Sequence, residues 1–325
     1  MDDCVSLIAP ARLHFGFLDP TGLSGRKFAS LGLVIEGYNV ELEVRRSKTL
    51  IITGDALDEE TTNFFGVTIT RLKKKYGFND DFKIILKEKP PRHSGFGSGT
   101  QLALALSRAL LEIINLKPRT EHLSLAVNRG KRSGIGILGF DKGGFIVDGG
   151  KLTDARQPPL ISRVCFPKNW KILLVMQDKA SHFYGDREIK AIEGLPKITK
   201  EKSSTLCRET LLRVIPAIID KDFDSFAKGL TNIQNLMGEI FFNAQDGSTF
   251  SSPSVGKVVS NLAENFEIGS GQSSWGPTGF AIFKSNDELQ KALTFLKKNN
   301  VLTNGLRLDV TCARNRGYQL FKSGR

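Results

Sequence analysis

Apolar residues along this chain repeat at two periods, and the places where the period changes predict the order of its elements. Clustered or alternating β-forming residues predict two strands in CVSLIAPARLHFGFL, broken at Ala9-Pro10, and a further strand in FKIILKE. The stretches SLGLVIEG and YNVELEVRR predict a hairpin that turns near Gly37. Helical spacing of apolar residues predicts a helix over residues 61–76.

A glycine-rich stretch, PPRHSGFGSGT, stands directly before a long apolar run. From about Gly99 onward, apolar residues recur at three- and four-residue steps: Leu102, Ala105, Leu106, Ala109, Leu110 and Ile113. The predicted helix therefore begins inside the loop, with its unpaired N–H groups and the positive end of its dipole directed at whatever the loop holds. Glycines also let a ligand approach the backbone closely. The pattern favours a phosphate or diphosphate site, and the alternative is a Gly/Ser turn that caps a core helix.

Proline residues separate the first half of the chain from the second. Residues 121–128 predict a short helix, and RGKRSGIGILGFDKGGFIVDGG ends in a strand, GGFIVDGG. Because Pro158, Pro159 and Pro167 interrupt the pattern before the strand WKILLVMQ, we place a domain boundary near residue 165, between domains of residues 1–165 and 166–325. Downstream, the pattern predicts helices over 205–219, 223–242 and 254–265, and the strands GFAIFK and GLRLDVTC flank a helix over 287–299. This alternation is typical of an α+β sandwich.

The composition narrows the class of protein. The chain has 325 residues, of which 40% are hydrophobic and 25% are charged, as in soluble globular proteins. Its apolar runs fall short of the roughly 20 residues of a membrane span, and MDDCVSLIAP lacks the layout of a secretion signal. We therefore expect a cytoplasmic protein. The four cysteines lie far apart without a CxxC pair, which argues against a zinc site and a disulfide framework.

A net charge of +12 raises the possibility of a nucleic-acid partner. The lysines are spread along the chain, however, and their densest runs suit solvated helix faces. No aromatic-and-basic ladder accompanies them. We therefore expect an anionic small molecule and neither nucleic acid nor a membrane as the partner.

Four motifs together resemble the GHMP superfamily, which includes galactokinase, homoserine kinase and mevalonate kinases. They are ARLHFGFLD, HSGFGSGTQ, RSGIGILGFDKGGFIVDGG and GSGQSSWGPTGFAIF. Within that superfamily, the stretches RSGIG, GGFIVDGG and QSSWGPT make the chain resemble the β-ribofuranosylaminobenzene 5′-phosphate synthases over about residues 6–317.

The resemblance implies an N-terminal domain with a left-handed βαβ unit, a ferredoxin-like C-terminal domain and an active site in the cleft between them. It implies a reaction in which phosphoribosyl pyrophosphate and 4-aminobenzoate, or 4-hydroxybenzoate, give a C-riboside phosphate, carbon dioxide and pyrophosphate. This is the step that opens methanopterin biosynthesis in archaea and methylotrophs. Magnesium as the cofactor and a homodimer are implied as well.

One departure separates the chain from the kinases of the superfamily. These commonly carry an SGxxD stretch whose aspartate lies near the hydroxyl group to be phosphorylated. Here Ser133 and Gly134 are followed by residues without a carboxylate at that spacing, and Ile137 cannot accept a proton. Asp141 is nearby and keeps an ATP-dependent small-molecule kinase as the alternative.

Candidate site residues follow from the motifs. The loop and first helical turn provide amides, hydroxyls and possible ligand contacts for a diphosphate: His93, Gly95, Gly97, Ser98, Gly99, Thr100 and Gln101. Arg12 and His14 lie two residues apart on a strand and share a face. From that face Arg12 is a candidate to bind a carboxylate or phosphate through two hydrogen bonds, and surface placement is the alternative. Arg26 is a candidate for the 5-phosphate or the carboxylate, and Asp19 for magnesium, although an Asp-Pro turn is the structural alternative.

Two later segments complete the predicted site. Arg129, Lys131 and Arg132, with Ser133, form a basic, glycine-flanked segment that favours an anion over a solvated turn. Gln272, Ser273, Ser274 and Trp275 supply donors beside an aromatic plane suited to stacking on the benzoate ring, with a core role as the alternative for Trp275. Asp148 fits either a turn or a metal ligand. We assign no general base, because loss of carbon dioxide itself restores aromaticity.

Overall fold

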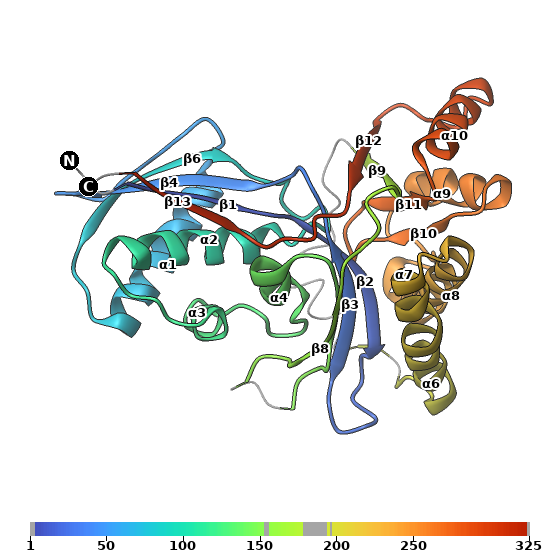
Figure 1. Cartoon of the computed structure of the whole chain (residues 1–325), viewed down its shortest axis with the longest axis horizontal. Coiled ribbons are helices and arrows are strands. Elements are labelled where there is room, and N and C mark those ends of the chain that lie inside the picture. The colour runs from blue at the N-terminus through green and yellow to red at the C-terminus, as the bar shows by residue number, and fades with distance from the viewer. Residues whose placement is uncertain (1–3, 153–155, 178–193, 196, 324–325) are drawn as a thin grey trace.

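The computed structural model describes residues 4–152, 156–177, 194–195 and 197–323 (Figure 1). Its first layer is a five-stranded sheet with the strand order β13-β1-β4-β6-β5. The strands are β1 (Cys4–Ala9), β4 (Val40–Ser47), β5 (Ile51–Thr53), β6 (Asp81–Glu88) and β13 (Gln319–Ser323). The helices α1 (Glu59–Tyr76), α2 (Ser98–Ile113) and α3 (Thr120–Ala126) lie on one side of this sheet (Figure 1). Because β5 and β6 are parallel and α1 connects them, they form a βαβ unit.

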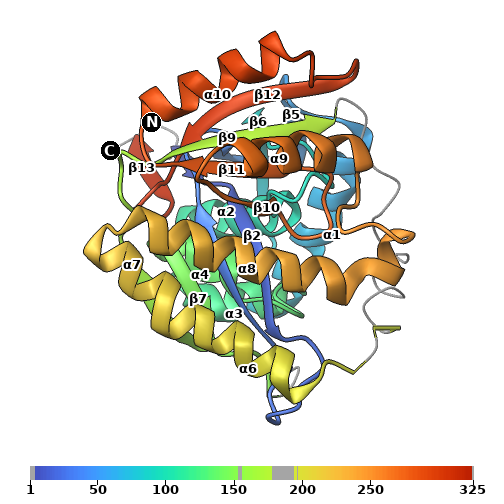
Figure 2. The ribbon, with the colours of Figure 1, turned by 90° about the vertical axis from the view of Figure 1, so that its right-hand side faces the viewer.

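A second sheet occupies the middle of the molecule and contains β2 (Arg12–Asp19), β3 (Phe28–Val34), β7 (Phe145–Asp148) and β8 (Leu160–Val164). The short helix α4 (Ile135–Lys142) packs against β3 and β7, whereas α8 (Phe223–Phe241) packs against β2. Figure 2 shows α8 crossing in front of β2, with α6 (Lys200–Glu209) and α7 (Ile215–Asp220) beside it. A π-helical turn, Thr210–Val214, joins α6 to α7.

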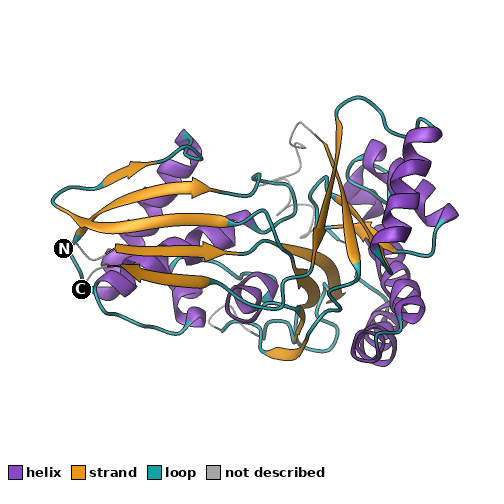
Figure 3. Ribbon diagram, turned by 45° about the horizontal axis from the view of Figure 1, so that its top comes forward, coloured by secondary structure: helices purple, strands orange, loops and turns teal. Residues whose placement is uncertain are grey.

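The third sheet, with the order β10-β11-β9-β12, forms the far end of the molecule (Figure 3). All its pairs are antiparallel, and the strands are β9 (Lys171–Gln177), β10 (Gly269–Gln272), β11 (Gly279–Phe283) and β12 (Leu306–Cys312). The helices α9 (Pro253–Asn265) and α10 (Asn286–Lys298) pack on it. This end of the molecule is therefore an α/β sandwich, as the sequence predicts.

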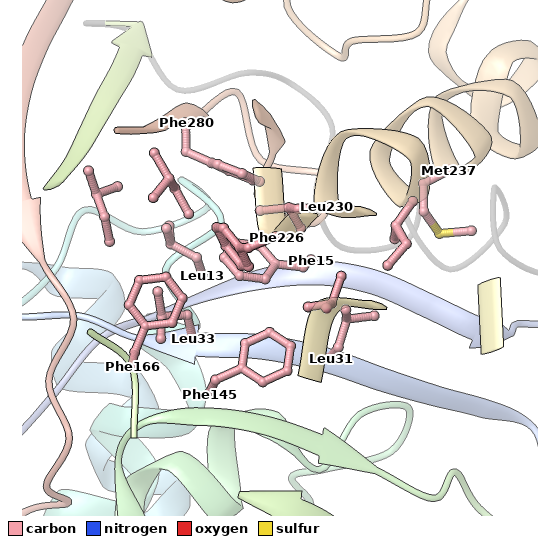
Figure 4. Packing of buried hydrophobic residues seen from close by; sticks show 14 of the residues in the cluster. Leu13, Phe15, Leu31, Leu33, Phe145, Phe166, Phe226, Leu230, Met237 and Phe280 are labelled. Atoms are coloured by element: carbon pink, nitrogen blue, oxygen red, sulfur yellow. The ribbon is translucent and has the colours of Figure 1, made fainter. Parts of the chain in front are cut away.

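One apolar core joins the middle sheet to the C-terminal half (Figure 4). Leu13 and Phe15 of β2 contribute to it together with Phe226 and Leu230 of α8 and Phe280 of β11. Phe15 lies 4.8 Å from Phe280, measured between ring centroids. Since β2 also carries three predicted site residues, Arg12, His14 and Asp19, this core fixes them relative to both halves of the chain.

The predicted hairpin near Gly37 is wrong. β3 pairs with β2 and β7, whereas β4 pairs with β1 and β6, so the two strands belong to different sheets. Alternation of apolar residues predicts a strand but carries no information on its partner. The linker before β4 instead bridges to the C-terminal segment through Ile35 and Ala313.

The end of the chain returns to the first sheet, where β13 pairs with β1. The predicted boundary near residue 165 takes no account of this return.

The helix α4 is an element that the sequence pattern did not predict, because four glycines interrupt its apolar spacing: Gly134, Gly136, Gly139 and Gly143. None of the helices in the described part of the chain has the length and apolar character needed to cross a membrane.

Candidate active site

The glycine-rich loop folds into a turn that exposes the start of α2. His93, Gly95 and Gly97 all have positive φ angles, of 59°, 81° and 73°. Gly97 is the residue before the helix, and no side chain caps the first turn. That turn also lacks an acidic residue, so the positive end of the helix is not neutralised within it. This geometry is compatible with an anion at the start of α2, and the phosphate site stays a prediction.

Hydrogen bonds from Arg12 and Ser273 fix the carbonyl oxygens of the loop. The Arg12 Nη1 atom donates to the Gly95 oxygen at 2.5 Å, and the Ser273 hydroxyl donates to the same oxygen at 2.7 Å. The Arg12 amide donates to the Phe96 oxygen at 3.1 Å. Arg12 thus positions the loop, and a β-carbon at Gly97 would lie 2.9 Å from its Cζ atom.

The start of α4 meets the start of α2. The Gln101 Nε2 atom donates to the Gly136 oxygen at 2.8 Å, and a β-carbon at Gly136 would lie 3.2 Å from the Thr100 methyl group. The N-terminus of α4 therefore lies against the first turn of α2 at Thr100 and Gln101. Helix N-termini favour negative charge, so this arrangement is compatible with the predicted anion site.

Asp148 fixes the segment that leads into α4. Its carboxylate accepts hydrogen bonds from the amides of Ser30, Gly134 and Gly150 and from the Ser30 hydroxyl. The Ser30 hydroxyl also lies 2.6 Å from that of Ser133. Burial raises the pKa of Asp148, against the effect of these hydrogen bonds. The sequence allowed Asp148 to be either a turn residue or a metal ligand, and these hydrogen bonds favour the turn.

His14 is deeply buried and lies near two of the predicted arginines. Only 2% of it is exposed, and its Nδ1 atom accepts a hydrogen bond from the Gly16 amide. Its Nε2 atom is buried and has no hydrogen-bond partner among the described residues. Burial, followed by the nearby charges of Arg12 and Arg132, holds the pKa of His14 well below 6.5. The imidazole is therefore neutral at pH 7, and Arg12, His14 and Arg132 lie close together.

The turn Ser273 to Gly276 lies between the loop and a cavity. Ser273 contacts the loop and also accepts a hydrogen bond from the His14 amide at 3.0 Å. The Gln272 amide group bonds Gln245, Ser274 and Ser251, which holds the turn in place. Trp275 is 4% exposed and lies 4.5 Å from Phe241 between ring centroids, while its Nε1 atom has no partner in the described structure.

The cavity beside this turn has a volume of about 540 Å³. Its walls come from β2, α8, α9 and β10, and aromatic or sulfur-containing residues supply much of the apolar surface: Phe17, Met237, Phe241, Phe250 and Trp275. His14, Gln234, Gln272 and Ser274 add polar groups. Because His14 lines the cavity and lies near Arg12 and Arg132, the cavity is close to these two cations.

Several candidates occupy positions with structural contacts. Arg26 donates from Nε and Nη2 to the carbonyl oxygens of Gly149 and Gly150, at 2.7 and 3.0 Å. The Asp19 carboxylate accepts from the amides of Gly22, Leu23 and Ser24, as in an Asp-Pro turn. His93 lies 3.6 Å from the Glu60 carboxylate.

A preformed magnesium cage does not fit these residues. The oxygens of Asp19 and Asp148 are committed to backbone amides. Among the described residues, no three side chains of His, Cys, Asp or Glu are grouped to hold a metal ion. Asp141, on which the kinase alternative depends, accepts a hydrogen bond from the Thr120 hydroxyl at 2.7 Å and so faces α3.

Sequence reasoning missed three residues beside the loop. Phe64 of α1 lies under two guanidinium groups, with the Cζ atoms of Arg129 and Arg92 at 4.8 and 5.5 Å from its ring centroid. Arg71 is close enough to contribute to a lowered pKa at Arg129. Arg92 belongs to the glycine-rich segment PPRHSGFGSGT, so the sequence could have suggested it as an anion ligand. Phe64 and Arg71 could not be found in this way, because only the fold brings α1 to the loop.

Comparison with known proteins gives the same picture of the fold. The model of the GHMP kinases N-terminal domain matches residues 63–141, and that of the GHMP kinases C-terminal domain matches residues 214–302. A solved homoserine kinase from Cytophaga hutchinsonii is similar over 99% of this chain and 98% of its own, with a TM-score of 0.66 and 17% identity. A mevalonate diphosphate decarboxylase from Enterococcus faecalis is similar over 99% and 100%, with a TM-score of 0.67 and 15% identity.

The similarity in sequence is more specific. The chain is 30% identical to the beta-ribofuranosylphenol 5′-phosphate synthase of Archaeoglobus fulgidus, over 97% of this chain and 98% of the relative. It is 29% identical to the enzyme of the same name from Methanothermobacter thermautotrophicus, over 96% and 97%. With two GHMP domains and near-complete coverage of these relatives, the chain belongs to the beta-ribofuranosylphenol 5′-phosphate synthase family of the GHMP superfamily.

Proposed function

We propose that the protein is a decarboxylating phosphoribosyltransferase that acts on phosphoribosyl pyrophosphate and a 4-substituted benzoate. The main support is the similarity over nearly the full chain to synthases whose name describes a ribosylated phenol carrying a 5′-phosphate. A phenol product requires a hydroxyl group on the acceptor ring. This favours 4-hydroxybenzoate, although 4-aminobenzoate fits the same chemistry.

In the proposed reaction, the ring carbon that bears the carboxylate bonds to C1 of the ribose while the bond from C1 to the diphosphate oxygen breaks. The bond between the ring and the carboxylate then breaks, and its electron pair returns to the ring as carbon dioxide leaves. No proton has to be removed from the ring. The reaction therefore depends on positioning and charge stabilisation, and not on a general base.

The diphosphate is proposed to occupy the glycine-rich loop. Ser98 and Gly99 start a helix with no side-chain cap, and the neighbouring start of α4 adds a second positive end. Negative charge develops on the leaving diphosphate, and donors fixed in advance stabilise such charge strongly. Arg12 contributes by holding the loop, which makes it a positioning residue. Magnesium is proposed only as an ion that arrives bound to the diphosphate, which is a common mode of Mg²⁺ binding.

The acceptor ring is proposed to occupy the cavity lined by His14 and Trp275. Its aromatic walls suit a planar ring, and a volume of about 540 Å³ exceeds what one benzoate ring requires. The Nε1 hydrogen of Trp275 and the neutral His14 imidazole offer partners for polar substituents. The turn that contains Trp275 also contacts the loop through Ser273, so one element borders both proposed substrates.

The kinase alternative has weaker geometric support. Ile137 stands where the kinase aspartate is expected, and the Asp141 carboxylate is hydrogen-bonded to Thr120. Burial raises the pKa of Asp141, which would favour its protonated form more than in water. Because it is hydrogen-bonded to Thr120 of α3, this carboxylate is poorly placed to act on a hydroxyl group at the loop.

One assay separates the two functions. The purified protein is incubated with magnesium, phosphoribosyl pyrophosphate and carboxyl-labelled 4-hydroxybenzoate or 4-aminobenzoate, without ATP. We expect labelled carbon dioxide and pyrophosphate in equal amounts. If neither acceptor releases carbon dioxide from a protein that binds the donor, the transferase proposal is wrong and the kinase becomes the first hypothesis.

A further inference from the structure

Arg92 and Arg129 lie over the ring of Phe64 beside the start of α2, and Arg71 is close enough to Arg129 to lower its pKa. We name Phe64, Arg71, Arg92 and Arg129 the arginine cluster. Arg71 and Phe64 come from α1, Arg92 from the segment before the loop, and Arg129 from the segment before α4. The Arg129 Nη1 atom would lie 3.5 Å from a β-carbon at Gly99. The cluster therefore adjoins the glycine-rich loop at Gly99.

Positive charge in this cluster exceeds negative charge. Arg92 forms an ion pair with Glu60 at 2.8 Å, and Glu60 is 58% exposed in its side chain. Arg129 has no carboxylate partner among the described residues, although it is partly buried against Phe64. Burial and then the charges of Arg92 and Arg71 lower the pKa of Arg129 to about 10. Cations held this close repel one another unless an anion lies between them.

Two guanidinium donors without hydrogen-bond partners also indicate an anion site in the arginine cluster. The Nε atom of Arg129 and the Nη1 atom of Arg92 are buried without a hydrogen-bond partner in the described structure. A buried donor that lacks a partner costs stability. A phosphate group has several acceptor oxygens and pairs with guanidinium groups through two parallel hydrogen bonds. Stacking on Phe64 orients both guanidinium planes.

We propose that the arginine cluster binds a sugar phosphate monoester, namely the 5-phosphate of the ribosyl donor, while the loop binds the diphosphate. This inference rests on the proposed function for the identity of the donor, but not for the anion site itself. The two anionic ends of the donor would then lie on either side of Gly99, at the start of α2. Charge at both ends fixes the orientation of the ribose without a protein contact to C1.

The test uses two probes that separate the sites. Calorimetry measures the binding of ribose 5-phosphate, which lacks the diphosphate, and of inorganic pyrophosphate, which lacks the sugar. Arg129→Gln removes the charge, and Arg119→Gln is the matched control because Arg119 is 75% exposed and pairs with Glu121. We expect Arg129→Gln to weaken ribose 5-phosphate by about tenfold or more, since one charged hydrogen bond contributes about 1.5–3 kcal/mol. Pyrophosphate binding should change far less, and Arg119→Gln should change neither.

The outcomes distinguish this inference from the transferase proposal. If the wild-type protein does not bind ribose 5-phosphate, or if Arg129→Gln binds it as the wild type does, the arginine cluster is not the phosphate site. If ribose 5-phosphate binding depends on Arg129 but no carbon dioxide is released in the assay above, the site is right and the proposed reaction is wrong. A weaker affinity for both probes to the same extent would indicate a general loss of positive potential and would also overturn the inference.

Discussion

His14 shows how the surroundings of one residue decide its chemistry. A histidine on an exposed strand would titrate near pH 6.5. Here burial and two arginines favour the neutral imidazole, so the residue offers a lone pair or an N–H group but no positive charge. A neutral His14 beside Arg12 and Arg132 does not add a third cation to the site.

His14 predicts a pH dependence of stability. Because its pKa is lower in the folded than in the unfolded protein, the unfolded state binds more protons between those two values, and stability falls as the pH drops below about 6.5. We expect His14→Gln to lose less free energy of unfolding than the wild type between pH 7.5 and pH 5.5, as measured by urea titration. Equal losses in the two proteins would show that His14 is not held neutral.

Trp275 permits a direct test of the acceptor cavity. The chain has two tryptophans, and Trp170 is buried in the core against Phe166 and Phe223. We expect 4-hydroxybenzoate to change the fluorescence of Trp275, and Trp275→Phe to remove this signal and to weaken binding measured by calorimetry. Trp170→Phe is the control and should keep the response. A response that disappears only with Trp170 would place the ligand elsewhere.

At the scale of an element, the loop and α2 act as one unit. The amide groups at the start of α2 are presented because Gly97 adopts a left-handed conformation and leaves room for Arg12. The Arg12 guanidinium and the Ser273 hydroxyl then hold the Gly95 carbonyl. The loop therefore depends on β2 and on the turn after β10, which are distant in sequence.

Gly97→Val is expected to abolish pyrophosphate binding while the protein stays folded. The side chain would clash with Arg12 and oppose a φ of 73°. Gly77→Val is a matched control, since Gly77 ends α1 with a φ of 69° and has open space around it. Both variants carry backbone strain of about 1 kcal/mol or more, so the control accounts for that strain, and only Gly97→Val adds the clash with Arg12. Calorimetry that finds unchanged pyrophosphate affinity in a folded Gly97→Val protein would contradict the assignment of the loop.

At the scale of the whole molecule, the C-terminal segment ties the sheets together. Arg314 is 3% exposed, and its amide donates to the Val34 oxygen of β3 at 2.8 Å. Its guanidinium group bonds Glu36 at 3.1 Å and the side chain of Gln319 in β13 at 3.1 Å. One residue thus connects the middle sheet, the linker before β4 and the last strand.

Arg314→Ala is expected to lower the free energy of unfolding by about 3 kcal/mol, because it leaves Glu36, the Gln319 side chain and the carbonyl oxygens of Arg316 and Gly317 without their partner. Arg45→Ala serves as the control, since its ion pair with Glu43 is exposed and such pairs contribute little. Guanidinium titration measures both. A loss for Arg314→Ala no larger than that for Arg45→Ala would mean that the segment does not connect the sheets energetically.

The sequence by itself determined most of the elements, and it located the glycine-rich loop at the start of a helix. Local spacing set the helices α1, α2, α8, α9 and α10, and the glycines before an apolar run predicted a phosphate loop at the mouth of α2. The family followed from motifs along the chain, and the comparisons confirmed it. These features depend on residues that are neighbours in the sequence, so their physical causes are visible in it.

Only the tertiary structure decided which segments meet. It separated β3 from β4 into two sheets, returned β13 to β1, and committed Asp19 and Arg26 to backbone groups. It also brought Phe64 and Arg92 to Arg129, and Trp275 to a cavity beside His14. Strand pairing, burial and charge repulsion depend on residues that are far apart in the chain. The local spacing of residues therefore cannot predict them.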